Sequence, residues 1–174
     1  MQIDTGKEKI LIVYYSHSGN TRQIAKQIHT SIGGDLVEIE TVDQYPTDHS
    51  DILDQARKEI YAGYRPTLKT KIERVKAYTL LFLGYPNWWG TIPTPVSAFL
   101  EENDLSGKTI APFCTHGTGG LARTVEAIEQ MCPDSEVLDA LGIVNNRVHE
   151  AESDVSEWLS RIREKTGSAL DMRH

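Results

Sequence analysis

Short apolar runs that suit β-strands alternate along the chain with amphipathic segments that suit α-helices, and this alternation limits the possible folds most. The strand-like runs lie at Lys9 to Tyr15, Leu36 to Glu40, Tyr78 to Gly84, Thr109 to Cys114 and Val137 to Val144. The helical patterns follow at Thr21 to Ile32, Ser50 to Tyr64, Pro93 to Glu102, Leu121 to Met131 and Ala151 to Lys165. Such alternation is typical of βαβ units and predicts an α/β fold whose mostly parallel sheet carries helices on both faces.

The composition of the strands predicts their order. The first, third and fourth runs are apolar on both sides, as strands buried between two helical layers should be. The second run, Leu36-Val37-Glu38-Ile39-Glu40, alternates apolar and acidic residues and suits a half-exposed edge. We therefore expect five parallel strands in the order 2-1-3-4-5. In such a sheet ligands bind beyond the carboxyl ends of the strands, between the first and third strands.

The chain has 174 residues, enough for one domain that buries its own core. We expect that core to span about residues 8–166, with a fraying tail at 167–174 and a polar surface loop, the longest irregular piece, at 41–50. A formal net charge of -7 argues against a nucleic-acid partner. The polar start of the chain and the short first apolar run predict neither a signal peptide nor membrane insertion. Two cysteines, Cys114 and Cys132, form no redox or metal motif, which favours a cytoplasmic location.

A hydroxyl-rich loop follows the first strand and leads directly into a helical pattern. It reads Ser16-His17-Ser18-Gly19-Asn20-Thr21. A helix that begins at such a loop presents free backbone N–H groups and the positive end of its dipole. We expect this loop to bind a phosphate group largely without cationic side chains. Arg22, the first cation after it, is expected to turn outward as a solvated helix residue.

Two further loops follow the third and fourth strands, at the same edge of the predicted sheet. The second contains Pro86, Asn87, Trp88, Trp89 and Gly90, and its adjacent indoles suit stacking on a planar heterocycle, although either ring can instead cover the core. The third contains Thr115, His116, Gly117, Thr118, Gly119 and Gly120. Its glycines allow the backbone to approach the polar edge of such a ring. His116 can contact a ligand or hold the loop.

Together these three loops resemble those of the flavodoxin family over nearly the whole chain. The second loop is similar to a Pro-x-Trp-Trp-Gly pattern followed by prolines, matched by Pro86, Trp88, Trp89, Gly90, Pro93 and Pro95. The resemblance implies a flavodoxin-like three-layer sandwich that binds one FMN without a covalent bond. It also implies that a backbone carbonyl near Trp89 and Gly90 accepts a hydrogen bond from the reduced flavin.

Three functions remain open from the sequence. The resemblance favours a low-potential electron-transfer protein that serves a redox partner protein or a small-molecule electron acceptor. The alternative is an FMN-dependent NAD(P)H:quinone-type oxidoreductase, although the sequence carries no dedicated nicotinamide motif. A flavodoxin-shaped module without flavin is the third reading. In the first two readings the flavin carries the electron chemistry, so we predict no catalytic side chain and no metal ligand.

Overall fold

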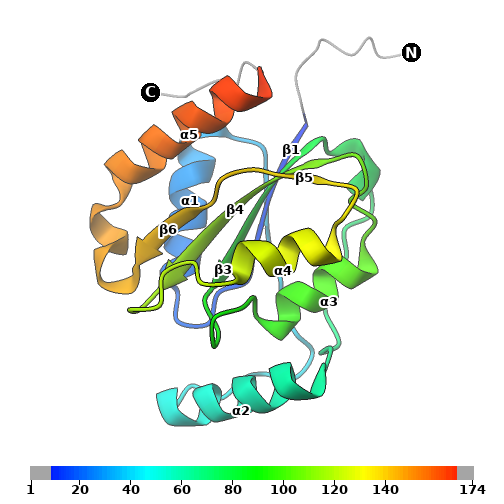
Figure 1. The fold of residues 1–174 in the computed structure, drawn as a ribbon, viewed down its shortest axis with the longest axis vertical. Coiled ribbons are helices and arrows are strands. Elements are labelled where there is room, and N and C mark those ends of the chain that lie inside the picture. Colours follow the sequence, from blue (N-terminus) through cyan, green and yellow to red (C-terminus); the bar gives the residue numbers. More distant parts are fainter. Residues whose placement is uncertain (1–8, 168–174) are drawn as a thin grey trace.

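A parallel β-sheet forms the centre of the molecule in the computed structural model, which describes residues 9–167 (Figure 1). Its strands are β1 (Ile10–Tyr14), β2 (Asp35–Glu38), β3 (Leu80–Pro86), β4 (Thr109–His116), β5 (Glu136–Val137) and β6 (Leu141–Val144). The strand order β2-β1-β3-β4-β5 confirms the predicted order, and every pairing is parallel. β2 is partly exposed, as expected at an edge. The carboxyl ends of β1, β3 and β4 therefore meet at one side of the sheet.

The predicted fifth strand, Val137 to Val144, is divided in two. β5 pairs with the start of β4, whereas β6 pairs with its end. Between them the carbonyl oxygen of Asp139 accepts a hydrogen bond of 2.9 Å from Nε1 of Trp158, a fully buried residue. The interruption between β5 and β6 thus supplies the acceptor for the buried indole N–H, a long-range contact that the local sequence pattern does not show.

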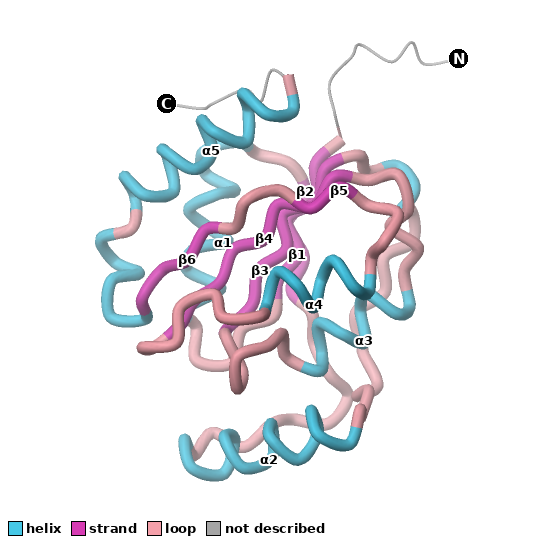
Figure 2. Tube along the Cα trace, viewed as in Figure 1, coloured by secondary structure: helices cyan, strands magenta, loops and turns pink. Residues whose placement is uncertain are grey.

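Helices cover both faces of the sheet (Figure 2). Each face has its own core of buried side chains. Helices α1 (Asn20–Ile32) and α5 (Glu152–Thr166) enclose the core around Trp158, and helices α3 (Thr94–Glu102) and α4 (Thr124–Met131) the core around Phe99. Short 3₁₀ helices lie at Val75–Ala77 and Asn145–Glu150. α4 begins three residues later than predicted, because Gly120 and Ala122 have positive φ angles of 63° and 44°. Of the tail expected to fray, only Gly167, which ends α5, lies within the described residues.

Helix α2 (His49–Ala62) occupies an unexpected place. Figure 1 shows it beyond the carboxyl ends of the strands instead of flat against a face of the sheet. Only Ile52 and Ala56 of its residues are buried. A connection over residues 63–79, with little regular structure, returns from α2 to β3 and is longer than the loop at 41–50 that we expected to be the longest. This connection lets α2 stand clear of the sheet.

Candidate functional site

A cleft of about 320 Å³ lies where the three predicted loops meet at the carboxyl edge of the sheet. From those loops it is lined by His17, Ser18, Asn20, Pro86, Asn87, Trp88, Trp89, Thr115, His116 and Gly117. Asn145 and four residues of α2, namely His49, Ile52, Leu53 and Ala56, complete the wall. The other predicted site residues, Ser16, Gly19, Thr21, Gly90, Thr118, Gly119 and Gly120, are absent from this lining. Several of them support the loops from behind.

The first loop presents backbone donors at the start of α1. Gly19, the N-cap residue, has a φ of 100°, which L side chains rarely adopt. Oγ of Ser16 accepts hydrogen bonds from the N–H groups of Gly19 (3.1 Å) and Arg22 (3.2 Å), so its own O–H stays available as a donor. Within residues 9–167, the N–H groups of Ser18 and Asn20 have no protein acceptor. These donors, together with the helix dipole, fit a phosphate group.

Charged and buried groups around the first loop have structural partners. Nη2 of Arg22 lies 2.6 Å from Oε1 of Glu38, so this side chain pairs with β2. The ion pair raises the pKa of Arg22. The hydroxyls of Thr21 and Thr115 share a hydrogen bond of 2.8 Å, and both residues are 1% exposed. Thr21 thus ties the first loop to the third.

The second loop makes a tight turn. The backbones of Trp88 and Thr91 exchange two hydrogen bonds of 3.0 Å, and the two residues between them, Trp89 and Gly90, have φ angles of 55° and 82°. Positive φ at both central positions is the signature of a type I′ turn. A tryptophan in this conformation is strained, and the conformation persists only where the surroundings hold it.

Hydrogen bonds from two residues, Asn87 and Arg123, hold this turn. Oδ1 of Asn87 accepts a hydrogen bond of 2.8 Å from the N–H of Gly90, and Nδ2 donates one of 2.8 Å to the carbonyl of Gly120. The N–H of Arg123 donates to the carbonyl of Gly90 at 2.9 Å. Asn87, predicted as a ligand of the cofactor, therefore also connects the second loop to the third.

The two tryptophans point to different surroundings. Trp88 is 7% exposed and packs nearly perpendicular to the rings of Tyr15 and Tyr45, with centroid distances of 5.5 and 5.3 Å. Trp89 is 50% exposed, and its Nε1 donates a hydrogen bond of 2.8 Å to the carbonyl of Leu53 in α2. The guanidinium of Arg57 lies 5.7 Å from its ring centroid. Trp88 therefore belongs mainly to the core, and Trp89 is the ring with free surface at the cleft.

Sequence reasoning missed the contribution of α2 to the cleft. The spacing of Ile52 and Ala56 is that of any amphipathic helix that packs on a sheet, so the pattern indicated core packing only. The tyrosines behind Trp88 were missed as well. These tyrosines meet Trp88 from distant parts of the chain, so no local sequence pattern predicts the contact.

A reactive thiol, a metal site and a membrane-spanning helix were also considered within residues 9–167. Burial raises the pKa of the Cys114 thiol to about 12, which suits a packed core residue better than a nucleophile. Within residues 9–167, no group of three or more His, Cys, Asp or Glu residues is placed to hold a metal ion. The described helices also include none that is long and apolar enough to cross a membrane.

Solved structures share this fold. A flavoprotein of Lactobacillus acidophilus NCFM, solved in complex with FMN, has a TM-score of 0.69 at 25% identity, with 87% of this chain and 98% of that chain covered. A protein of Bacteroides eggerthii that was assigned as a flavoprotein has a TM-score of 0.73 at 26% identity, with coverage of 86% and 99%. Both chains match this one over nearly their whole length.

Sequence comparison also finds flavodoxins among the relatives of this chain. A flavodoxin of Haemophilus influenzae is 29% identical over 106 residues, which are 59% of this chain and 47% of that protein. The chain spans between 47% and 65% of the length of the first curated relatives that it matches. The sequence profile described as Flavodoxin matches residues 9–162, nearly all of the described structure. The chain therefore belongs to the flavodoxin family.

Proposed function

We propose that this protein binds FMN in the cleft and serves as a low-potential electron-transfer protein. The observation that carries the proposal is the pair of backbone N–H donors of Ser18 and Asn20 at the start of α1, which have no protein acceptor within residues 9–167 and suit a phosphate group. These donors lie at the same cleft as Trp89 and the third loop. The related flavoprotein of Lactobacillus acidophilus, solved in complex with FMN, supports this choice of ligand.

Each loop has a separate task in this proposal. Ser16, Ser18, Gly19, Asn20 and Thr21 hold or shape the phosphate site, with Thr21 acting through its bond to Thr115. Trp89 lies beside the isoalloxazine, and residues 115–120 approach its polar edge. FMN supplies the electron chemistry, and the protein supplies position, exclusion of water and electrostatics.

The electron donor and acceptor are a redox partner protein or a small molecule, and the expected location is the cytoplasm. A quinone-type reductase is the second candidate. The apolar residues Ile52, Leu53 and Ala56 of α2 favour it, because they form an apolar wall of the cleft that suits a small planar acceptor.

Titration with FMN and with riboflavin tests the ligand. The phosphate donors act only on FMN, so we expect much tighter binding of FMN than of riboflavin. Equal dissociation constants for the two flavins would remove the phosphate site from the proposal.

Anaerobic reduction of the FMN-loaded protein tests the electron-transfer role. An electron carrier should take up electrons in two separate one-electron stages, and NADH or NADPH should reduce it only slowly. Rapid two-electron reduction by either nucleotide, followed by turnover of a quinone, would favour the reductase instead.

A further inference from the structure

Helix α2 is a self-contained helix with little packing beneath it. Oδ1 of its N-cap residue Asp48 accepts a hydrogen bond from the N–H of Asp51 at 3.0 Å. At the other end Gly63, with a φ of 66°, closes the helix through hydrogen bonds to the last carbonyls. The helix is therefore complete by local interactions, although only Ile52 and Ala56 are buried. A helix with so few buried side chains belongs to the part of a fold that opens locally at low free energy.

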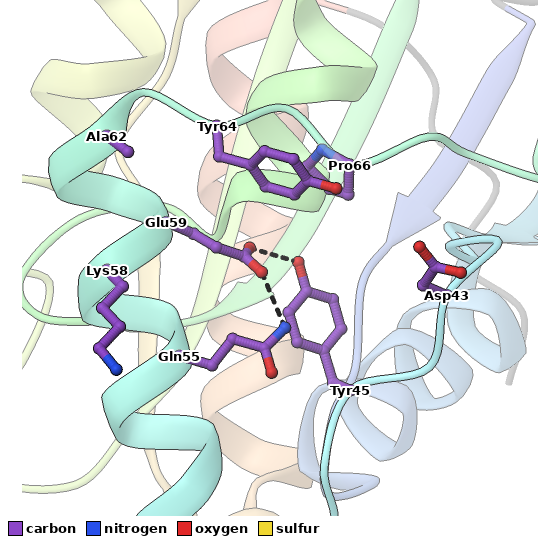
Figure 3. A pocket seen from close by; sticks show the side chains of 8 residues that line it. All are labelled: Asp43, Tyr45, Gln55, Lys58, Glu59, Ala62, Tyr64 and Pro66. Atoms are coloured by element: carbon purple, nitrogen blue, oxygen red, sulfur yellow. Dashed lines mark hydrogen bonds between the residues drawn. The ribbon is translucent and has the colours of Figure 1, made fainter.

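Cavities lie against two faces of α2. Ile52, Leu53 and Ala56 line the cleft assigned to FMN, whereas Gln55, Lys58, Glu59 and Ala62 line a second cavity of about 330 Å³. Figure 3 shows this second cavity between α2, Tyr45 and the segment that carries Tyr64 and Pro66. A helix with open space on two faces has few apolar contacts that oppose its displacement.

Polar contacts add to the packing of Ile52 and Ala56 in holding α2 in place. Oε1 of Glu59 accepts hydrogen bonds of 2.6 Å from the hydroxyl of Tyr45 and of 2.6 Å from that of Thr94, at the start of α3. Its Oε2 accepts one of 2.9 Å from Gln55 (Figure 3). We call Glu59, Tyr45, Thr94 and Gln55 the Glu59 network. The network fastens α2 to the connection before it and to the body of the domain.

The loops of the cleft are bonded to the same region. Nε1 of Trp89 donates to the carbonyl of Leu53, and Nε2 of His17 lies 2.7 Å from the carbonyl of Pro46, just before α2. The ring of Tyr45 also contacts Trp88. A displacement of α2 therefore changes the wall of the cleft and breaks bonds to two of its loops.

We infer that α2 is a movable cover over the FMN cleft, and that the Glu59 network controls how often it opens and hence how fast FMN enters and leaves. The inference rests on the proposed function, because FMN is taken as the ligand of the cleft. Glu59 lies outside the lining of that cleft. Glu59 and Tyr45 are thus positioning residues, which act on the ligand through α2.

The test compares Tyr45→Phe and Glu59→Gln with the wild type. Tyr45→Phe keeps the ring that packs on Trp88 and removes only the hydroxyl that binds Glu59. Loss of one net hydrogen bond should raise the rates of FMN capture and release by about fivefold to tenfold. Both rates should rise together, so that the dissociation constant changes far less than either rate. Stopped-flow flavin fluorescence measures capture, and dilution of the loaded protein measures release.

Tyr61→Phe is the matched control, because it also removes one phenol hydroxyl, but from an α2 residue that is 94% exposed. Its FMN rates should equal those of the wild type. Unchanged rates in both network variants, or an equal rise in Tyr61→Phe, would overturn the inference.

Hydrogen exchange in the protein without FMN separates this inference from the proposed function. Tyr45→Phe should speed the exchange of amides in α2 and leave those in α5 unchanged. If the amides of α2 exchanged equally fast in Tyr45→Phe and in the wild type, the inference that α2 is a movable cover would be overturned, whether or not FMN binds. Failure of the wild type to bind FMN would instead remove the proposed function, while the exchange result still decides whether α2 opens.

Discussion

Thr21 and Thr115 lie 94 positions apart, and their hydroxyls form a hydrogen bond with each other. The sequence predicted Thr21 as a ligand of the FMN phosphate, because hydroxyls after a strand are typical of phosphate loops, and Thr115 as part of the loop that approaches the edge of the flavin ring. Burial of both side chains makes their bond a structural link between two loops of the cleft. A hydroxyl in a loop looks the same in sequence whether it faces a ligand or another loop.

Replacement of Thr21 by valine should therefore destabilise the protein even without FMN. The change keeps the shape of the side chain but leaves the buried hydroxyl of Thr115 without a partner, at a cost of about 1–3 kcal/mol. Urea unfolding of the FMN-free protein measures this loss. Thr21→Ser, which keeps the hydroxyl, should retain more of the stability, and a Thr21→Val protein as stable as the wild type would contradict the assignment.

Asn87 supports the cleft through two hydrogen bonds, to Gly90 and to Gly120. Asn87→Ala should weaken FMN binding by about tenfold to hundredfold, since it releases the strained turn at Trp89 and separates the second and third loops. Asn87→Asp keeps the acceptor for the N–H of Gly90 and loses only the donor, so its dissociation constant should lie between the other two. Fluorescence titration measures all three. If Asn87→Asp and Asn87→Ala bound FMN equally well, the bond to Gly90 would not matter.

At the scale of elements, strands β3 and β4 depend on a glycine at their contact. Gly84 pairs with Phe113, and a Cβ added at Gly84 would lie 2.2 Å from the ring of Phe113. Such a contact forces the ring or the strand to move, so Gly84→Ala should lower the free energy of unfolding by about 1–3 kcal/mol.

A second substitution tests that explanation. Phe113→Leu in the Gly84→Ala background makes room for the methyl group, so the two changes together should cost less than their sum. Urea unfolding of the four proteins gives the coupling. Additive costs would mean that the ring of Phe113 does not oppose the new methyl group.

The same glycine shows what the sequence predicts well and where it stops. The pattern predicted the third strand at Tyr78 to Gly84, whereas β3 spans Leu80–Pro86, so the strand exists but begins and ends two residues later than predicted. Alternation and apolarity depend on local residues, so they predicted the sheet order and the three loops. The division of the fifth strand depends on Trp158, and the place of α2 depends on Glu59 and Trp89. These contacts join distant segments, so a local pattern does not contain them.

At the scale of the whole molecule, folding raises the pKa values of several tyrosines and of both cysteines. Burial raises the pKa of Tyr15, Tyr45, Tyr85 and both cysteines, and that of Cys114 reaches about 12. A hydrogen bond of 2.6 Å to Asp35 is the main cause that raises the pKa of Tyr78 to about 12. All these groups bind their protons more tightly in the folded protein than in the unfolded chain.

The protein should consequently lose stability steeply in alkali. Between about pH 9 and pH 12 the unfolded chain releases these protons while the folded protein retains them, so each such group lowers the free energy of unfolding by up to about 1.4 kcal/mol per pH unit. Below about pH 8 both states keep the protons, and these groups cause no slope. Urea unfolding from pH 7 to pH 11 measures the effect. Tyr78→Phe, which removes one of these groups, should make the fall above pH 10 shallower. A free energy of unfolding that stays level up to pH 11 would show that the buried phenols and thiols lose their protons as readily in the folded protein as in the unfolded chain.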